Sequence, residues 1–350
     1  MADQQGLLTL LVAGRTYRGW TGVPSIRTGL DGLAGGFGID LAEKFMGEPE
    51  LPVAIEDEVQ VKIDGVTIIR GHVDDVVRDL AADDHTVKLV GRDATADLVD
   101  CAAMNSPGEW RGVDGLSIIR AIAQPFGIAV ELAGGVSFGK AFDTFTLQKG
   151  EKAGAAVARV CAARGLLPFS DGRGVLVIGP GKPARISTRL VEGQNLKKVS
   201  HTASRRGRFR DYTVYAQSNL WGDGAANAGT AGAARDTGIH RYRPTARLAD
   251  DLADGITASD QAAWDARIGK AKANPVSCTA AGWLHADGPW QPNQEVWVEA
   301  PTVGFTGWRL IASVDLTLDK DGGTVAVLST LGAGAFDVLA EKQKGGVTTW

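Results

Sequence analysis

Alternating apolar and polar residues dominate the first hundred positions of the chain. Val59, Val61 and Ile63 are separated by single polar residues, and the dipeptide DG follows directly. This alternation predicts a strand with one buried face, and Asp-Gly favours a two-residue hairpin turn. A return strand to about Asp79, the turn AADDH and the strand TVKLV complete a predicted meander, with Gly71 where a bulge could bend the long strand.

After about residue 106 the apolar residues no longer alternate with polar ones but recur at helical spacing. The segments GLSIIRAIAQPFG and KAGAAVARVCAARG carry apolar residues at helical spacing, and they end at Pro125 and Gly165. The segment GVLVIGP that follows is a short strand. Residues 106–183 therefore predict a small α/β domain.

Strand-like segments resume with FRDYTVYAQ. The next segment, NLWGDGAANAGTAGAARDTG at 219–238, is so rich in glycine and alanine that it predicts a long loop. TASDQAAWDARIGKAKANP then predicts one helix, capped by Thr257 or Ser259 and followed by Pro275.

The last strand-rich part repeats the first. EDEVQVKIDGVTIIRGHVDDVVRDLAADDHTVKLV and NQEVWVEAPTVGFTGWRLIASVDLTLDKDGGTVAVL share a Glu-Val-x-Val opening, a middle glycine, a Val-Asp pair and a Thr-Val strand. The repetition predicts a duplication. The expected fold is mainly β with α/β, and multidomain: two related antiparallel β-barrel-like domains plus a small α/β domain.

The expected domain limits follow from these patterns. A first barrel-like domain spans 1–105 and the α/β domain spans 106–183. A second barrel-like domain spans 184–332 with the loop and helix insertion at 219–275, and 333–350 form a C-terminal tail.

Composition narrows the possible functions. The 350 residues include 46 glycines, which suits turn-rich β-architecture. A net charge of −4 gives no global cationic field for nucleic acid or anionic lipid. Cys101, Cys161 and Cys278 lie far apart, so we expect buried thiols rather than a zinc site or a disulfide framework. The polar start MADQQG and the lack of a long apolar run predict synthesis in the cytoplasm, without membrane insertion.

Three aspartates in GRDATADLVD pose a question of chemistry. Asp93 stands where a strand ends and a helix begins, so it predicts an N-cap. Asp97 and Asp100 then fall on the solvent side of the helix, while Leu98 and Cys101 face inward. The alternative is an acid/base or metal site, which the absence of a nearby histidine disfavours.

Other segments resemble motifs of binding or catalytic sites but lack a residue or element that the motif requires. GGVSFGKA at 134–141 has the glycines and lysine of a phosphate loop, but it ends in alanine and precedes no helix. The histidines show no metal-binding spacing and no serine sits in a G-x-S-x-G elbow; they are His72, His85, His201, His240 and His285. We therefore expect no catalytic residue, metal or cofactor, although a distributed triad stays open.

Two segments suggest contact surfaces. In RRGRFRD, Arg206, Arg208 and Arg210 would share one face of a strand beside Tyr212. That face could bind phosphates, but the acidic chain favours a solvated edge strand or ion pairs with a neighbouring subunit.

Trp297 is the second candidate. It alternates with Val296 and Val298, so it should point away from the core, as a protein contact or a sugar platform. The alternative is a local pair with another tryptophan on the same face of the sheet.

The order of these motifs resembles a known family. A meander ending in GRDATADLVD, then GLSIIRAIAQPFGI, SHTASRRGRFRDYTVYAQ, GWLHADGPWQPNQEVWVEAP and GWRLIASVDLTLDKDGGTVAVLSTLGAGAF resembles the baseplate hub proteins of contractile-tailed phages of the Mu type. The resemblance implies a structural, non-enzymatic virion protein with two related barrels. It also implies a homotrimeric ring that holds the central spike, contacts the tail tube and the tape-measure protein, and encloses the DNA passage.

Two other functions compete with this one. A tail-associated peptidoglycan hydrolase could use Asp93, Asp97 or Asp143. A nucleic-acid or glycan-binding module could use the arginines or the tryptophans. The segment at 219–238 matches no part of the family.

Overall fold

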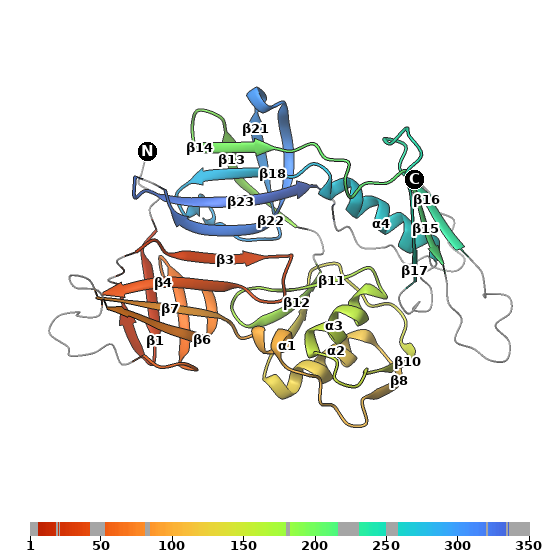
Figure 1. Ribbon diagram of the computed structural model, residues 1–350, viewed down its shortest axis with the longest axis horizontal. Helices are drawn as coiled ribbons and strands as arrows, with labels where there is room; N and C mark the ends of the chain where they lie inside the picture. Colours follow the sequence, from red (N-terminus) through yellow and green to blue (C-terminus); the bar gives the residue numbers. More distant parts are fainter. Residues whose placement is uncertain are drawn as a thin grey trace.

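A computed structural model describes residues 6–18, 20, 22–42, 53–80, 85–179, 183–215, 231–249, 258–319, 321–333 and 335. Two β-units lie one above the other, a helix-containing unit lies beside the first of them, and a smaller unit is inserted in the sequence between β14 and β18 of the second (Figure 1). None of the described helices is both long enough and apolar enough to span a membrane.

The first β-unit contains the predicted meander. Its strands are β1 (Leu8–Val12), β2 (Arg15–Tyr17), β3 (Ser25–Gly29), β4 (Gly36–Ala42), β5 (Glu58–Ile63), β6 (Val66–Leu80) and β7 (His85–Asp93). Asp64 and Gly65 form the hairpin turn, with φ of 48° and 79°. Gly71 is needed because β7 approaches closely: a Cβ there would lie 2.0 Å from the carbonyl oxygen of Arg92. The register shift of β6 comes just after it, between Val73 and Asp75.

The second β-unit repeats this arrangement. Its strands are β13 (Ala184–Val191), β14 (Leu196–His201), β18 (Val276–Ala281), β21 (Gln294–Ala300), β22 (Phe305–Leu318) and β23 (Thr324–Gly332). The short strands β19 (Leu284–His285) and β20 (Gly288–Pro289) and the 3-10 turn Pro301–Val303 complete it. β21, β22 and β23 form a meander in the order of β5, β6 and β7.

Backbone details support the duplication. Glu56 and Asn293 both have positive φ, 70° and 62°, which non-glycine residues adopt rarely. Each donates its N–H to a carbonyl of the long middle strand, at Val73 and Ile311 respectively. A register shift follows both acceptors directly. The two units thus share a strained turn and a bulge as well as a strand order.

The two β-units are joined in one sheet. β3 pairs antiparallel with β22 from Ser313↔Gly29 to Leu316↔Ile26, which makes a continuous sheet of 13 strands. In the described residues the units are therefore open and fused rather than two separate closed barrels. One hydrophobic core, which includes Trp283 and Trp290, runs through both.

The middle unit contains the predicted helices α2 (Gly115–Ala123) and α3 (Ala153–Ala162) and the short α1 (Ala96–Asp100). Asp114 caps α2 by accepting from the N–H of Ser117 at 3.0 Å. The strands are β8 (Glu109–Val113), β9 (Ala129–Leu132), β10 (Phe142–Thr146), β11 (Leu167–Ser170) and β12 (Val175–Gly179), with a 3-10 turn at Gln124–Phe126. Its core is separate from that of the β-units.

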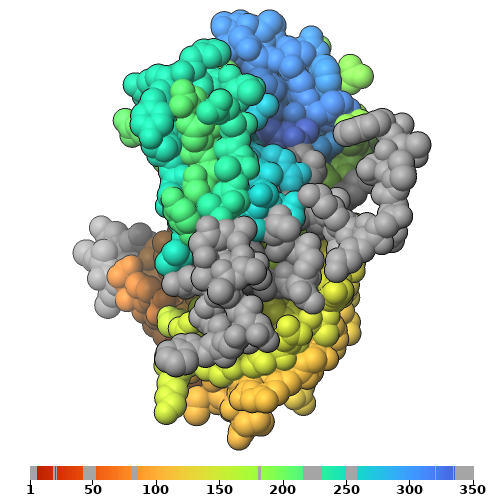
Figure 2. Space-filling view, turned by 90° about the vertical axis from the view of Figure 1, so that its right-hand side faces the viewer, coloured from red at the N-terminus to blue at the C-terminus, as the bar shows by residue number. Residues whose placement is uncertain are grey.

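The smaller unit corrects one prediction. β15 (Asp211–Tyr215), β16 (Ala231–Arg235) and β17 (Pro244–Leu248) form a three-stranded sheet, so the end of the predicted loop 219–238 is a paired strand. The earlier part of that segment lies outside the described residues. Gly232 allows the contact with α4 (Ala258–Lys272), since a Cβ there would lie 1.9 Å from the backbone of Ala258. The helix α4 ends before Pro275 as predicted; Thr257 lies outside the described residues and Ser259 is within the helix. Figure 2 shows the described parts of this unit in green and teal, at one end of the molecule beside the second β-unit in blue.

Candidate subunit and partner interface

Trp297 lies on the face of β21 opposite the core. Val296, Val298 and Ala300 are fully buried in the core, while Trp297 alternates with them and is half-buried. Its ring meets the ring of Trp308 edge to face, with centroids 5.6 Å apart. The predicted strand phase is therefore present in the structure, and so is the alternative that paired Trp297 with another tryptophan.

Two arginines of β13 cover this pair. The guanidinium of Arg189 lies 5.8 Å from the ring centroid of Trp297, and that of Arg185 lies 4.6 Å from the centroid of Trp308. Arg185 also forms a 2.9 Å ion pair with Glu295. These five residues form a tryptophan–arginine ladder across β13, β21 and β22.

The sequence alone did not identify the two arginines. Arg185 and Arg189 are four residues apart in ARISTRL, a spacing that places both on the same face of a strand, and this was the available signal. What it could not show is that β13 runs parallel to β21 and places Arg189 opposite Trp297.

The ladder presents both charge and an aromatic surface to the outside. The Arg185 side chain is 62% exposed. The indole nitrogen of Trp297 is buried and has no hydrogen-bond partner in the described part of the chain. A combination of aromatic rings and arginines is typical of contact surfaces between proteins.

The arginine segment differs from the prediction. Residues 206–210 are not a strand, since β15 begins at Asp211. Arg208 is buried and forms a bidentate ion pair with Asp236. Arg210 pairs with Asp211 at 2.7 Å and stacks over Tyr242 at 5.3 Å.

These contacts break up the predicted face of three arginines. Arg206 is exposed, whereas Arg208 is buried inside the small unit and holds the turn that follows β16. The hydrogen bond from Arg208 lowers the pKa of the Asp236 carboxyl. Because that pKa is depressed, the stabilising contribution of Asp236 is present above the ordinary aspartate pKa and is lost as the pH falls through the lowered value.

Asp93 is a buried hydrogen-bond acceptor that joins three parts of the chain, and it is not the N-cap of α1. The N-cap of α1 is Thr95, which makes no side-chain capping bond. The Asp93 carboxylate accepts from the N–H of Gly35 at 2.5 Å, the N–H of Thr95 at 3.0 Å, the hydroxyl of Ser170 at 2.8 Å and the hydroxyl of Thr95. It thereby ties the start of β4, the start of α1 and the end of β11 to one side chain.

Burial dominates the titration of Asp93. It raises the pKa of the carboxyl, and the hydrogen bonds oppose the rise. The Thr95 hydroxyl also contacts the carbonyl oxygen of Leu33, so its single proton faces two oxygens. Because its pKa is raised, Asp93 favours the folded state at low pH, and that contribution is lost as the pH rises through the raised pKa.

The neighbouring residues also have structural roles. Asp97 is exposed, and Asp100 forms a 2.6 Å ion pair with Arg92. Leu98 is buried as predicted, but Cys101 is exposed, because the chain leaves the helix there in an extended conformation. Cys161 and Cys278 are buried, and burial raises the pKa of Cys278 to about 12.

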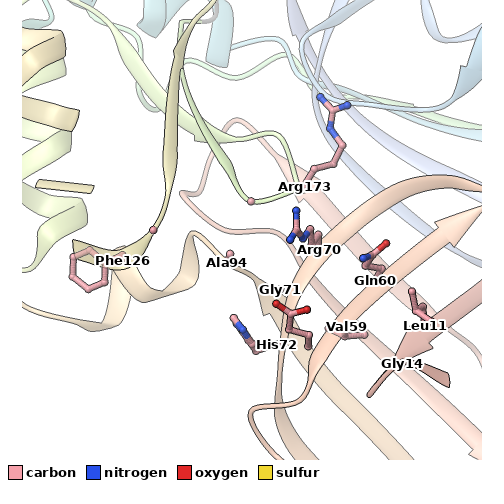
Figure 3. Close-up of a pocket in the computed structure, with 13 residues that line it drawn as sticks. Leu11, Gly14, Val59, Gln60, Arg70, Gly71, His72, Ala94, Phe126 and Arg173 are labelled. Carbon is pink, nitrogen blue, oxygen red and sulfur yellow. The ribbon is translucent and has the colours of Figure 1, made fainter. Parts of the chain in front are cut away.

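Among the described residues, the remaining motifs form no catalytic arrangement. The segment 134–141 leads into strand β10, not into a helix. No group of three or more metal-binding side chains occurs in the described ranges. A cleft of about 340 Å³ between the first β-unit and the middle unit contains Arg70, Arg173 and His72 (Figure 3), but its lining has no serine, threonine or cysteine nucleophile.

Comparisons with known proteins agree with this picture. The family model "Mu phage baseplate assembly protein GpP-like, N-terminal" matches residues 7–93, and "Baseplate hub protein gp44-like, second domain" matches residues 95–180. The baseplate hub protein gp44 of Escherichia phage Mu is 33% identical over 329 residues, covering 90% of this chain and 85% of the relative.

Two solved structures have the same fold. The 43 kDa tail protein of prophage MuSo2 from Shewanella oneidensis is 28% identical, with a TM-score of 0.82 over 95% of this chain and 100% of that chain. A tail protein from Neisseria meningitidis is 21% identical, with a TM-score of 0.78 over 95% of this chain and 98% of that chain.

Fold and relatives together define a structural phage tail protein. The matched relatives are named as hub and tail proteins rather than as enzymes. The chain belongs to the gp44-like family of baseplate hub proteins. It is a structural baseplate hub protein, and the hydrolase alternative is not favoured.

We predict that Asp93→Asn lowers the free energy of unfolding by about 1–3 kcal/mol, because an amide keeps one acceptor oxygen and turns a donor toward groups that themselves donate. Simple capping would leave Asn nearly as stable as Asp. Chemical denaturation measures the change, and Asp97→Asn on the exposed face serves as control. Equal unfolding midpoints for Asp93→Asn and the parent protein would contradict the role of Asp93 as the acceptor that joins these segments.

We predict that Arg208→Met destabilises the small unit by about 3–5 kcal/mol, because it leaves the Asp236 carboxylate buried without its cation. Hydrogen exchange of β15 and β16 should speed up, while exchange in β22 stays unchanged. In the parent protein, protection of β15 and β16 should fall as the pH drops through the lowered pKa of Asp236. Arg206→Met, on an exposed neighbour, should change neither; an equal effect of both variants would refute the ion pair's role.

Proposed function

We propose that three copies of the chain form a ring at the base of a contractile tail. The ring joins the six-fold tail tube to the trimeric central spike and encloses the DNA passage. The observation that carries this proposal is the internal repeat: two β-units of the same strand order in each chain give six similar units in three copies. A three-fold ring of this kind can face six-fold symmetry on one side and three-fold symmetry on the other.

Charge is consistent with a passage for DNA. The chain carries 41 acidic and 37 basic residues, so a lumen built from it would not hold DNA in transit. We propose no specific DNA binding, no membrane insertion and no cofactor.

The proposed place of the protein is the virion, in the tail baseplate, after synthesis in the host cytoplasm. Its relatives are baseplate and tail proteins, which supports assembly with other tail components. We propose the spike protein, the tube or its initiator, and the tape-measure protein as those partners. We also propose that the limits at 105, 183 and 332 separate domains, with the insertion 219–275 in the third and a tail at 333–350.

We expect a molar mass of about 110 kDa in solution, three times the 36.7 kDa of the chain. Light scattering coupled to size exclusion, over a range up to high micromolar concentration, measures it. A monomer throughout, together with no ring in purified tail particles, would contradict the proposed ring.

We expect Trp297→Ala to weaken assembly by about 2 kcal/mol or more, as the loss of an interface anchor does. In the subunit itself the loss of the pair with Trp308 should cost about 0.5–1.5 kcal/mol in addition to the loss of the half-buried apolar area of the ring. Sedimentation over a dilution series measures assembly, and thermal unfolding of the monomer measures stability.

Trp297→Phe is the matched control, because it keeps a ring opposite Trp308. If Trp297→Ala assembles like the parent protein, Trp297 is not part of a subunit contact. A loss of about 3–5 kcal/mol in subunit stability would instead indicate a core role.

A further inference from the structure

The small unit is basic although the chain as a whole is acidic. Its described residues at 204–215 and 231–249 contain eight arginines, two aspartates and neither lysine nor glutamate, which gives a net charge of +6. The whole chain carries −4. The small unit therefore has a local cationic field that the net charge of the chain does not reveal.

The two aspartates neutralise only part of this charge. Asp236 pairs with the buried Arg208, and Asp211 pairs with both Arg210 and Arg235. These contacts lie inside the unit or along its sheet, where they hold neighbouring segments together. They leave half of the arginines of the unit to be accounted for.

Four other arginines carry most of the remaining charge. Arg247 has its own partner, Asp265 of α4, at 2.7 Å. Within the described part of the chain no carboxylate forms an ion pair with the others, which are Arg205, Arg206, Arg241 and Arg243. The first three of these are exposed and Arg243 is half-buried. Their charge is thus available at the surface.

Arg243 fixes the segment that carries two of these arginines. Its guanidinium donates to the carbonyl oxygens of Arg205 at 3.0 Å, Arg206 at 3.2 Å and Arg208 at 3.3 Å. In the other direction, the N–H of Arg210 donates to the carbonyl oxygen of Arg243 at 2.9 Å. These bonds hold residues 205–210 beside residues 240–243, so the cationic side chains of both segments share one surface.

An exposed tyrosine lies on the same surface. Tyr242 is 75% exposed, and the guanidinium of Arg210 lies 5.3 Å from its ring centroid. Together these side chains form an arginine patch, which consists of Arg205, Arg206, Arg210, Arg241, Tyr242 and Arg243. Arginine and tyrosine are among the residues enriched where proteins contact one another.

The patch has a physical cost in the isolated chain. Like charges gathered on one surface repel one another and destabilise the folded state. Backbone carbonyls offset part of this cost at Arg243, but the exposed guanidinium groups keep unused donors. A guanidinium is suited to bind a carboxylate through two parallel hydrogen bonds. An anionic partner would therefore remove the repulsion and use these donors.

The surroundings favour a protein over a nucleic acid as this partner. Duplex DNA carries one negative charge about every 1.7 Å along its axis and is held by many phosphate contacts. The arginine patch is confined to two short segments, and the chain that bears it is acidic overall. A compact acidic segment of a protein matches that size and charge better than an extended phosphate backbone does.

The patch lies away from the repeated β-units. In Figure 1 the sheet of β15, β16 and β17 is at one end of the molecule, and α4 lies between that sheet and β23. The unit is inserted between β14 and β18, and the described part of the first β-unit has no equivalent insertion. A contact at the patch is therefore separate from any contact that the two repeated units make.

We infer that the arginine patch binds an acidic segment of another tail protein, in which several aspartate or glutamate side chains are exposed close together. Each chain contains the whole patch, so a single copy can bind. The inference adds a contact to the proposed function and does not depend on the ring.

An acidic peptide tests the chemistry of the patch. The probe is a short fluorescein-labelled polyglutamate peptide, and fluorescence anisotropy measures its binding to the full chain. We expect binding that weakens as salt is added, with no binding of a polyglutamine peptide of the same length. Arg206→Gln with Arg241→Gln should raise the Kd about tenfold or more, because two exposed cations are lost.

A matched control removes the same charge elsewhere. Arg18→Gln with Arg70→Gln takes two exposed arginines from the first β-unit and should leave the Kd unchanged. An equal loss in both double variants would show that only net charge matters and would overturn the inference. Tighter binding of a duplex DNA of equal charge, lost with the same two arginines, would overturn it as well.

Arg243→Lys tests whether geometry matters as well as charge. Lysine keeps the positive charge, but it cannot reproduce the planar fork that contacts three carbonyls. We expect weaker binding of the probe and faster hydrogen exchange at residues 205–208. Unchanged binding with faster exchange would show that the patch acts as diffuse charge, against the arranged surface inferred here.

Photo-cross-linking in purified tail particles identifies the partner. Tyr242→benzoylphenylalanine places a photoreactive ring in the patch, and mass spectrometry identifies the attached peptide. We expect an acidic segment of a different tail protein. Tyr215→benzoylphenylalanine, at the other end of β15, is the control and should not label that segment.

Two results of the cross-linking would overturn the inference, namely attachment to a second copy of this chain or no attachment at all. Light scattering decides the proposed ring separately. A monomeric chain that binds the probe through the patch keeps the inference and counts against a stable free ring. A trimer that does not bind the probe keeps the ring and refutes the inference.

Discussion

The pairing of β3 with β22 is the constraint on which the rest of the structure depends. Four residue pairs join the two β-units, and the N–H of Leu30 donates to the carbonyl of Ala312 at the bulge, 2.7 Å away. Because the sheet is continuous, one core runs through both units, and their relative orientation is fixed by backbone hydrogen bonds.

The middle unit is held to that sheet by polar contacts. Asp93 ends β7 and binds both Gly35 in the first β-unit and Ser170 in the middle unit. The N–H of Arg70 in β6 donates to the carbonyl of Gly172 at 2.7 Å, close to the same place. Burying a carboxylate is costly, so its four donors are required for the junction to hold. The middle unit therefore has a defined position on the first β-unit.

Duplication explains why similar strands have different surroundings. β6 and β22 are both long middle strands with a bulge and the same preceding turn, yet among the described strands β22 is paired on both sides just after the bulge and β6 on one side. Among the described residues, the tryptophan–arginine ladder is also found on the second unit and not on the first. A repeated fold that differs in its exposed edges and aromatic residues can contact unlike partners with like backbones.

Local pattern in the sequence determined most elements. The Asp-Gly hairpin, the helices around Ile118 and Val157, the outward phase of Trp297 and the repetition of the meander all follow from alternation, helical spacing and turn chemistry, which act between near neighbours. The order of motifs also identified the family.

Only the tertiary structure decided the long-range contacts. Asp93 resembled a cap because strand-to-helix junctions favour acidic caps, but its partners Gly35 and Ser170 lie 58 and 77 residues away. The local sequence around Arg208 predicted an exposed strand residue. In the fold Arg208 is buried and forms an ion pair with Asp236, 28 residues further along the chain. The joining of the two β-units through β3 and β22 likewise depends on segments almost 300 residues apart. Pairing between distant edges depends on which surfaces the folded chain brings together, and no local period encodes that.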